Sequence, residues 1–523
     1  MFVALGIVTI SLFATPYPEG VEVPRNLTAE EAEIVGRNPI TPPRGVTSPP
    51  IGPIHCVAEY EPMDAILLAW EGSSSWKTIV ARMAAGITTV GNADAIIVVD
   101  TTSEESGAIT QINSYGGDTS RVKFVVRATD TIWIRDYGPR YIYEGDCRAI
   151  VDHTYNRPRP NDNSLNGYFG TVSGHQVYEL PLVHGGGNFH LNAGAVAWAT
   201  ELIADENGGM SDAEIRAYWQ DYQNLDVTIT DAFPTSVDST QHIDMWMCWA
   251  SDTTCIISDW PYNSGSVQDV ICDTTTATLQ FLGYTVVRAP ARSVSWTHYT
   301  YANSVICNDL VLVPSYTNSS VAQHNAEAIA AWQTACPDKT ILSVPCENIV
   351  SSAGVMHCIC MHIPRHLGGS APTAHLQTPT GGQLFQPDQH VPVSWITDDD
   401  VAVQSVSIDL SIDGGSSWQA VASGLDNAGI YIWVVPDIAT HDGKLRVTAV
   451  DGSGNTGSDA GDGLFIINGT QIAGDVNGDG LVNVEDILQV MGNWGACGLS
   501  CPEDLDGDGT VGVTDLLIVV ANW

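Results

Sequence analysis

The runs AILLAW (65–70), AIIVVD (95–100) and VKFVVR (122–127) decide the fold of the first part of the chain, because each is short, apolar and rich in β-formers. Two further runs, CIISDW (255–260) and LVLVPSY (310–316), follow the same pattern. Stretches with helical periodicity lie between them, such as SDAEIRAYWQDYQN (211–224), where Ser211 and Glu214 have the spacing of a capping box. Strands alternating with helices predict an α/β domain whose chemistry lies on loops and strand ends.

The 523 residues exceed what one hydrophobic core usually serves, and the composition changes along the chain. We expect a catalytic domain over 25–367 and a Gly/Pro/Ser/Thr-rich linker over 368–376. Short alternating strands over 377–469 predict an all-β, immunoglobulin-like sandwich. The last segment, 471–523, contains two copies of one pattern and is expected to form a small helical calcium-loop domain.

The first residues, MFVALGIVTISLFATP, have the apolar character of a signal h-region, so we expect a signal segment over 1–20 and a secreted or cell-surface protein. No later run is long and apolar enough for a membrane span. With 60 acidic and 20 basic residues, the formal net charge is -40, which disfavours nucleic acid and favours a cationic substrate. Among the twelve cysteines, Cys497 and Cys501 are the best disulfide candidates.

The duplicated pattern is GDVNGDGLVNVEDILQVM (474–491) and EDLDGDGTVGVTDLLIVV (503–520). Oxygen-bearing side chains recur at the spacing of a calcium loop, with a glycine at the sharp turn and a helix expected after each loop. The expected ligands are Asp475, Asn477, Asp479, Asn483 and Asp486 in the first copy, and Asp504, Asp506, Asp508 and Asp515 in the second. Position 12 is Asp rather than Glu, and the loop-then-helix duplication resembles a dockerin domain, which implies calcium binding and a cohesin-type protein partner.

Three segments supply residue types suited to hydrolysing a guanidinium, which needs a thiolate, carboxylates around the cation and a proton carrier. In WIRDYGP (133–139), Asp136 is expected at a strand end. In QHIDMWM (241–247), His242 and Asp244 are expected on one face of a strand. In GVMHCICMHIP (354–364), Cys358 and Cys360 alternate along an apparent strand. No single one of these signals is strong: the carboxylate alone fits a turn equally well, and an isolated histidine or cysteine more often has a structural role.

These three segments, in this order along the chain, resemble the motifs of the family of bacterial peptidylarginine deiminases and agmatine deiminases. The resemblance spans about 55–366 and also includes EYEPMDAILLAW (59–70), HGGGN (184–188) and YTYANSVICNDLVLVPSY (299–316). It implies a five-bladed α/β propeller around a central pocket. The sequence departs from the family pattern at Gln241, where a glycine usually precedes the catalytic histidine.

The resemblance implies a role for each matching residue. Cys358 would be the nucleophile, His242 the general acid/base, and Asp136 and Asp244 the carboxylates that hold the guanidinium. Asn303 would lie near the cysteine. A covalent thiouronium intermediate is expected, with the bound cation and His242 favouring the thiolate. The reaction would use no redox cofactor or catalytic metal, since calcium is assigned to the C-terminal segment.

Substrate choice depends on HTYNRPRPND (153–162), whose Arg157 and Arg159 resemble the pair that binds the α-carboxylate of a C-terminal arginine in bacterial peptidylarginine deiminases. Trp133 is expected to line the substrate channel. C-terminal peptidyl-arginine is therefore the expected substrate, converted to citrulline and ammonia. Two alternatives remain: an agmatine deiminase that makes N-carbamoylputrescine, and a non-catalytic calcium-dependent scaffold or adhesion protein.

Overall fold

The computed structural model describes residues 17–18, 20–42, 47–469, 472–478, 481–497 and 501–523. The expected signal segment lies almost entirely outside these residues, as does the expected calcium ligand Asp479. The chain divides into two compact units, residues 1–144 with 148–365, and residues 145–147 with 366–523. In the described residues, no helix combines the length and the hydropathy that crossing a membrane requires.

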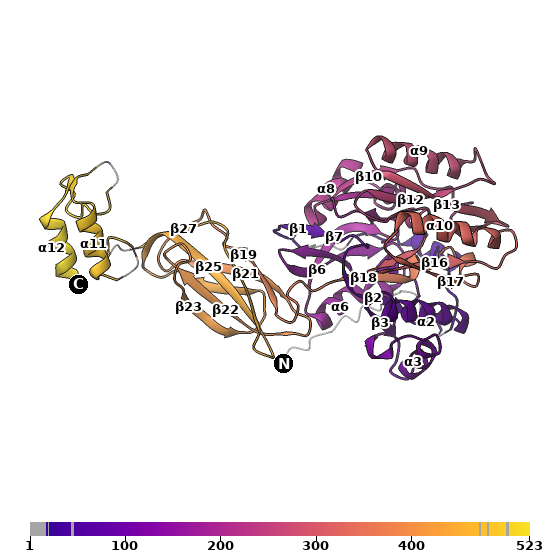
Figure 1. The fold of residues 1–523 in the computed structure, drawn as a ribbon, viewed down its shortest axis with the longest axis horizontal. Coiled ribbons are helices and arrows are strands. Elements are labelled where there is room, and N and C mark those ends of the chain that lie inside the picture. The colour runs from indigo at the N-terminus through magenta and orange to yellow at the C-terminus, as the bar shows by residue number, and fades with distance from the viewer. Residues whose placement is uncertain (1–16, 19, 43–46, 470–471, 479–480, 498–500) are drawn as a thin grey trace, which may run out of the picture. The chain divides into compact units, whose positions relative to one another are not determined.

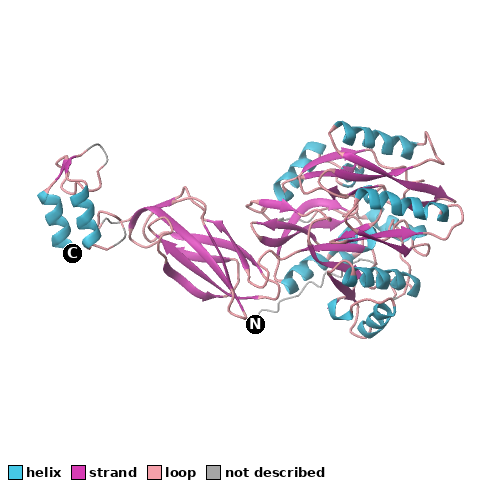
Figure 2. Ribbon diagram, viewed as in Figure 1, coloured by secondary structure: helices cyan, strands magenta, loops and turns pink. Residues whose placement is uncertain are grey.

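The described part of the first unit contains five small sheets, each with three or four strands (Figures 1 and 2). The first sheet has the order β18-β2-β3-β4 and the second β1-β5-β6-β7. Their strands are β18 (Cys360–Pro364), β2 (Met63–Ala69), β3 (Asp94–Val99), β4 (Val122–Val126), β1 (Ile54–Cys56), β5 (Arg140–Glu144), β6 (Cys147–Tyr155) and β7 (Gln176–His184).

The third, fourth and fifth sheets have the orders β10-β9-β8, β11-β12-β13-β14 and β15-β16-β17. Their strands are β8 (His190–Leu191), β9 (Val196–Thr200), β10 (Asp226–Thr230), β11 (Met247–Trp249), β12 (Thr254–Asp259), β13 (Thr285–Val294), β14 (Thr297–Thr300), β15 (Val305–Cys307), β16 (Leu310–Ser315) and β17 (Thr340–Pro345).

Every one of these sheets contains a parallel pair of strands joined by a helical crossover. Such pairs need a long connection, which explains the alternation of strands and helices in the sequence. The crossovers contain α2 (Ser74–Thr89), α3 (Glu105–Ser114), α5 (Pro160–Asn163), α6 (Leu165–Ser173), α7 (Leu202–Glu206), α8 (Asp212–Gln223), α9 (Val267–Phe281) and α10 (Asn325–Ala335). Helix α8 begins with the capping box predicted at Ser211 and Glu214.

The last strand of the unit, β18, pairs antiparallel with β2, one of its first strands. Figure 1 shows the two strands side by side although almost three hundred residues separate them. The apolar residues of β2 are buried, as the continuous run AILLAW predicts for a strand covered on both faces. This pairing returns the segment around Cys358 to the beginning of the domain.

The second unit begins with two sheets around one core, as the predicted sandwich requires, and the immunoglobulin-like type remains a prediction. The expected linker is shorter than 368–376, because β19 begins at Thr373. One sheet contains β19 (Thr373–Thr378), β21 (His390–Asp398) and β24 (Ile430–Val434). The other contains β20 (Leu384–Phe385), β27 (Phe465–Asn468), β25 (Ala439–Asp451), β22 (Val403–Ser411), β23 (Gln419–Leu425) and β26 (Thr456–Ala460).

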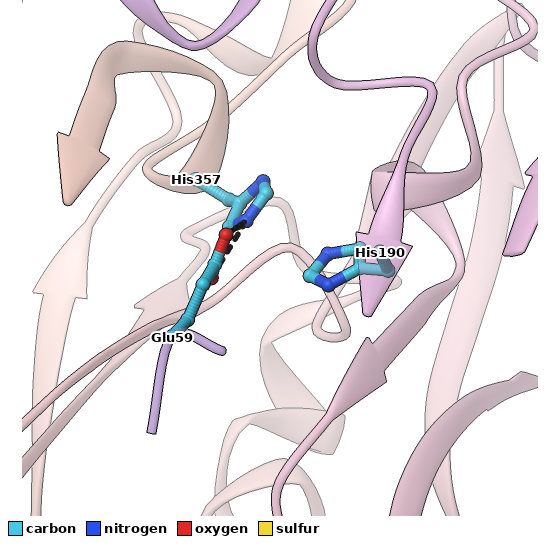
Figure 3. A group of neighbouring side chains, drawn as sticks. All are labelled: Glu59, His190 and His357. Carbon is cyan, nitrogen blue, oxygen red and sulfur yellow. Dashed lines mark hydrogen bonds and ion pairs between the residues drawn. The ribbon is translucent and has the colours of Figure 1, made fainter. Parts of the chain in front are cut away.

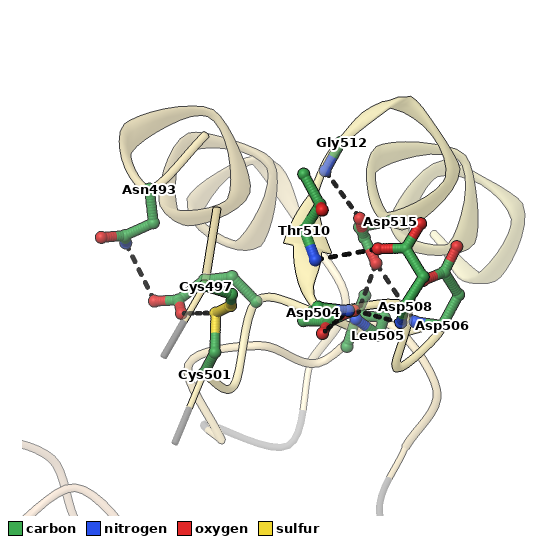
Figure 4. Close-up of a disulfide and its surroundings, with 12 residues drawn as sticks. Asn493, Cys497, Cys501, Asp504, Leu505, Asp506, Asp508, Thr510, Gly512 and Asp515 are labelled. Atoms are coloured by element: carbon green, nitrogen blue, oxygen red, sulfur yellow. Dashed lines mark hydrogen bonds between the residues drawn. A yellow bond between two sulfur atoms is a disulfide. The ribbon is translucent and has the colours of Figure 1, made fainter. Parts of the chain in front are cut away.

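The C-terminal segment has a helix after each expected loop, α11 (Val484–Gly492) and α12 (Val513–Asn522), as the repeat predicts. A short ribbon of β28 (Gly495–Ala496) and β29 (Thr510–Val511) lies between them. Figure 4 shows the disulfide between Cys497 and Cys501, which confirms the expected pair.

Candidate functional site

The site lies in the first unit and contains a side chain that the sequence analysis did not consider, Arg25. This arginine belongs to the segment that leads into α1 (Ala29–Arg37), and its side chain is fully buried. Its guanidinium touches all four residues expected to carry the chemistry: Asp136, Asp244, His242 and Cys358. The chain's own arginine therefore stands where the guanidinium of a substrate would bind.

Two carboxylates hold the guanidinium from different sides. Arg25 Nε and Nη2 donate to Asp136 Oδ2 and Oδ1 at 2.8 and 2.7 Å. Nη1 and Nη2 donate to Asp244 Oδ1 and Oδ2 at 3.1 and 3.0 Å. Paired, charge-assisted hydrogen bonds of this kind fix both the position and the plane of the cation.

The reactive groups lie at the two terminal nitrogens. Cys358 Sγ is 2.6 Å from Arg25 Nη1, and His242 Nδ1 is 2.8 Å from Nη2. Asn303 Nδ2 lies 3.2 Å from the sulfur and also donates to the main-chain oxygen of Asp244 at 3.0 Å. The five expected catalytic residues are thus brought together, with the sulfur on one terminal nitrogen and the imidazole on the other.

The local structure that presents these residues differs from the strands predicted. Asp136 lies in the one-turn helix α4 (Ile134–Tyr137), and Asp244 lies in the 3-10 turn η2 (Ile243–Met245), with His242 just before it. Cys358 lies in the 3-10 turn η5 (His357–Ile359), and strand β18 starts only at Cys360. A short turn can direct neighbouring side chains to one point, whereas a strand alternates them between faces.

Burial and charge set the protonation of the carboxylates. Burial alone would raise the pKa of Asp136, but Arg25 and His242 hold it well below the usual range. Asp244 behaves alike: burial opposes ionisation, and Arg25 and then His357 lower the pKa of its carboxyl. Both groups are therefore anions beside the bound cation.

The thiol and the imidazole shift in opposite directions. Burial raises the pKa of Cys358 well above its usual value, although Arg25 lowers it, and Asp244 and Asp136 raise it further. Burial, followed by the charge of Arg25, lowers the pKa of His242. These two directions favour a neutral thiol beside a neutral imidazole over the expected thiolate, because burial of the sulfur opposes the effect of the neighbouring cation.

The HGGGN turn makes room for the guanidinium. A Cβ atom on Gly187 would lie 1.8 Å from Arg25 Nη2 and 2.8 Å from carboxylate oxygens of Asp136 and Asp244. A Cβ on Gly185 would lie 2.7 Å from His242 Cε1. The Gly187 amide also donates to Asp136 Oδ1 at 3.2 Å, so only a residue without a side chain fits here.

A chain of buried and half-buried polar groups supports Asp244, and Figure 3 shows three of its members, Glu59, His190 and His357. His357 Nδ1 lies 2.9 Å from Asp244 Oδ2, and His357 Nε2 lies 3.0 Å from both carboxylate oxygens of Glu59. Glu59 in turn accepts from Arg135 Nη1 at 2.6 Å, and His190 stacks on the His357 ring with centroids 4.7 Å apart. Glu59, His190 and His357 could together face a metal ion, but the Arg135 cation and the two carboxylates on His357 favour a supporting hydrogen-bond chain.

The three residues expected to bind substrate contact the main chain of the Arg25 segment. Trp133 Nε1 donates to the Val23 oxygen at 2.8 Å. Arg157 Nε donates to the Arg25 oxygen at 3.3 Å. Arg159 Nη2 donates to the main-chain oxygens of Pro24 and Asn26 at 2.8 and 3.3 Å.

Arg159 also forms a buried ion pair with Glu31, with Nε 2.7 Å from Oε1. Glu31 completes the capping box at the start of α1, where its Oε2 accepts from the Thr28 amide at 2.8 Å. The two arginines expected to bind a terminal carboxylate therefore bind main-chain carbonyl oxygens and one side-chain carboxylate.

Gln241, where the family usually has glycine, adopts a φ of +60°, in the left-handed region that glycine favours. Its side chain donates to the Phe233 oxygen at 3.1 Å, and its main-chain oxygen accepts from Thr200 Oγ1 at 2.9 Å. Gln241 therefore adopts, just before His242, a backbone conformation that a glycine would adopt without strain.

The chain belongs to the family of Porphyromonas-type peptidyl-arginine deiminases, whose model matches residues 55–364. The agmatine deiminase of Ectopseudomonas mendocina is 22% identical over 376 residues, covering 62% of this chain and 98% of the relative. Two solved agmatine deiminases share the fold. The one from Enterococcus faecalis has a TM-score of 0.52 at 18% identity and covers 63% of this chain and 100% of that one. The one from C. jejuni has a TM-score of 0.50 at 17% identity, with 60% and 96% covered.

These similarities define a hydrolase of mixed α/β fold that deiminates guanidino groups, which agrees with the resemblance read from the motifs. Arg25 lies outside the matched residues, and it could not have been found from a motif. Glu59 and Gly187 lie within quoted motifs, EYEPMDAILLAW and HGGGN, but their roles depend on contacts with distant residues.

Proposed function

We propose that the protein hydrolyses the guanidinium of peptidyl-arginine to the urea of citrulline and releases ammonia. The buried contact of Arg25 with Asp136, Asp244, His242 and Cys358 carries the proposal. The cation is an arginine side chain, and its main chain continues on both sides of the pocket. A peptide is therefore the substrate that best matches this geometry.

In the proposed mechanism, Asp136 and Asp244 hold the guanidinium so that its central carbon faces Cys358 Sγ. The sulfur forms a bond to this carbon, and the thiol proton passes through His242 to Nη2. The bond from the carbon to Nη2 then breaks, and ammonia leaves. His242 next takes a proton from water, the resulting hydroxide attacks the thiouronium carbon, and collapse releases citrulline and restores the thiol.

Contacts of Arg157 and Arg159 support a peptide over agmatine. Arg157 lies on the Arg25 carbonyl oxygen, the atom that would be a carboxylate oxygen in a C-terminal arginine. A C-terminal arginine would therefore gain a charge-assisted bond here, and we retain it as the preferred substrate. Agmatine lacks this carbonyl, and its second cation would face both guanidinium groups. It remains the second candidate, because relatives of the chain are agmatine deiminases.

The test is citrulline and ammonia release from C-terminal peptidyl-arginine, internal peptidyl-arginine, free arginine and agmatine. An Arg25→Ala variant keeps the pocket open, and an Arg25→Ala/Cys358→Ala variant is the blank. Turnover of the peptides with a silent blank supports the proposal. Turnover of agmatine alone would replace the peptide substrate with the small amine, and no turnover would favour the non-catalytic scaffold.

We also propose that the five small sheets are the blades of the five-bladed propeller implied by the family. Each described sheet has a parallel pair with a helical crossover, which supports this arrangement. Radial order of the sheets in a crystal structure is the observation that tests it.

For the C-terminal segment we propose calcium binding, supported by the second loop (Figure 4). Oxygens of Asp504, Asp506 and Asp508 lie within 4.8 Å of one another, a spacing that suits one hard cation. Asp515 accepts from the amides of Leu505, Asp506 and Gly512, a set of contacts that closes the loop. A calcium titration followed by thermal unfolding, with Asp508→Asn as the weakened variant, tests the site.

We propose a cohesin-type protein partner for the same C-terminal segment. Export, which the expected signal segment over 1–20 implies, is also a proposal. Exposed apolar residues recur at corresponding positions of the two helical copies, which suits a protein partner. They are Val484, Leu488, Met491 and Trp494 in the first copy and Val513, Leu517, Val520 and Trp523 in the second. Binding of a purified cohesin domain, lost when Leu488 and Leu517 become Asp, is the test.

A further inference from the structure

We infer that Arg25 is an intramolecular substrate, so that Cys358 converts the chain's own residue 25 to citrulline. The inference rests on the proposed function, but it assigns a modification site that lies outside the catalytic motifs. Arg25 is fully buried, with its terminal nitrogens 2.6 Å from Cys358 Sγ and 2.8 Å from His242 Nδ1. These are the distances of a bound reactant rather than of a surface arginine.

The main chain around Arg25 is held on both sides, as a peptide substrate would be. The Arg25 amide donates to the Ser352 oxygen at 3.0 Å, and its carbonyl oxygen accepts from Arg157. On the preceding side, Trp133 holds Val23, and on both sides Arg159 holds the flanking carbonyl groups. The side chain therefore enters the pocket from a fixed backbone.

Helix α1 anchors the segment a few residues after Arg25. The capping box of Thr28 and Glu31 begins this helix, and the buried Glu31–Arg159 ion pair ties it to the pocket wall. Attachment to the same chain replaces a bimolecular encounter by a unimolecular one, which raises the effective concentration of the reacting group. Conversion of residue 25 should therefore precede turnover of any free peptide.

The reaction at Arg25 is balanced by one water molecule. Sγ bonds to the guanidinium carbon, the carbon–Nη2 bond breaks, and Nη2 leaves as ammonia with the proton of the thiol. Water then supplies an oxygen to the carbon as the carbon–sulfur bond breaks. The products are a neutral urea at residue 25, the restored thiol and one ammonium ion.

The product binds the pocket less well than the arginine does. Nη2 donates to Asp136 Oδ1 and Asp244 Oδ2 at 2.7 and 3.0 Å, and in citrulline an oxygen takes the place of this nitrogen. Three acceptor oxygens would then face one another, and two buried carboxylates would lose their cation. Conversion therefore releases the side chain and opens the pocket to other peptides.

The experiment is peptide mapping of the purified full-length protein by mass spectrometry, with wild type beside Cys358→Ala and Cys358→Ser. Citrulline at residue 25 appears as the mass change of NH to O and as loss of tryptic cleavage after residue 25. We expect it in wild type and in neither variant. Arg37, which is exposed on α1 with 75% of its side chain accessible, is the control and should stay arginine.

Mixing wild type with an isotopically labelled Cys358→Ala chain separates the intramolecular route from attack by another copy. The labelled chain should keep its arginine at residue 25, and its conversion would overturn the intramolecular assignment. If Arg25 stays unmodified in wild type, the inference is overturned. If the Arg25→Ala variant nevertheless turns over peptides, the proposed function still stands. If Arg25→Ala also turns over no guanidine, both fail together.

Discussion

Replacing Gly187 by alanine should abolish recognition of the guanidinium, because the added Cβ would lie 1.8 Å from the position of Arg25 Nη2. Ordinary contact begins near 3.4 Å, so the nitrogen must move by about 1.6 Å. Its bonds to Asp136 and Asp244, now 2.7 and 3.0 Å, would then exceed hydrogen-bond distance.

The size of the effect follows from the two bonds lost. Hydrogen bonds to charged groups contribute about 1.5–3 kcal/mol each, so the loss is about 3–6 kcal/mol. This corresponds to a fall of roughly 10²- to 10⁴-fold in kcat/KM. The assay is steady-state citrulline release from an arginine peptide, with Gly187→Ala placed in the Arg25→Ala background so that the pocket is open in both chains.

The matched control is Gly208→Ala, because a Cβ there meets nothing closer than 3.9 Å and the residue lies in the same unit. Thermal unfolding of all three chains separates a binding defect from a folding defect. A Gly187→Ala enzyme that keeps kcat/KM within about threefold of its parent, a change below 1 kcal/mol, would refute the view that the guanidinium occupies the place of Arg25.

Three further predictions address the support, the peptide contacts and the ionisation of the site. Glu59→Gln removes the charge that holds His357, which in turn contacts Asp244. The kcat should therefore fall roughly tenfold or more while KM changes little, as when a residue that orients a catalytic group is lost. An unchanged kcat would contradict the positioning role. Arg159→Met in the open-pocket background should raise KM for peptides by roughly 10- to 100-fold, because the peptide loses a donor to its carbonyl oxygens. Agmatine turnover should not fall, and should rise if the Arg159 cation repels the second cation of agmatine. Equal loss for both substrates would argue against main-chain recognition. The kcat should stay level between about pH 6.5 and 8.5, because burial lowers the pKa of His242 and raises that of Cys358, so that the acid limb lies below the ordinary histidine value and the alkaline limb above the ordinary cysteine value. A sharp optimum inside this interval, measured with buffers of constant ionic strength, would contradict these directions.

The sequence predicts the chemistry of the site better than its local structure. Asp136, His242, Asp244 and Cys358 could be chosen because their residue types match the needs of guanidine hydrolysis and their motifs occur in the order of one family. The strands expected for them are helical turns, because three or four residues between two sheets give too short a pattern to distinguish a turn from a strand.

Arg25 could not be predicted for a different reason. Its contacts with Asp136 and Cys358 span 111 and 333 residues of sequence, and no periodicity marks it. The surrounding PRNL stretch is typical of a surface loop. Only the fold shows that the basic residue of this stretch is enclosed by acidic partners from distant segments.

The placement of the catalytic residues follows from the repeated topology rather than from any one sheet. Asp136 lies on the connection from the first sheet to the second, the HGGGN turn from the second to the third, and His242 with Asp244 from the third to the fourth. Asn303 lies on the connection from the fourth sheet to the fifth, and Cys358 on the return from the fifth to the first. The sheets share hydrophobic cores with one another, whereas each connection has its own sequence, so five unrelated short segments can meet around one cation. A site built in this way needs the last connection to return to the first sheet, and the pairing of β18 with β2 provides that closure. The reactivity of Cys358 therefore depends on the topology of the whole domain, and the segment that carries Arg25 enters the space that the five connections enclose.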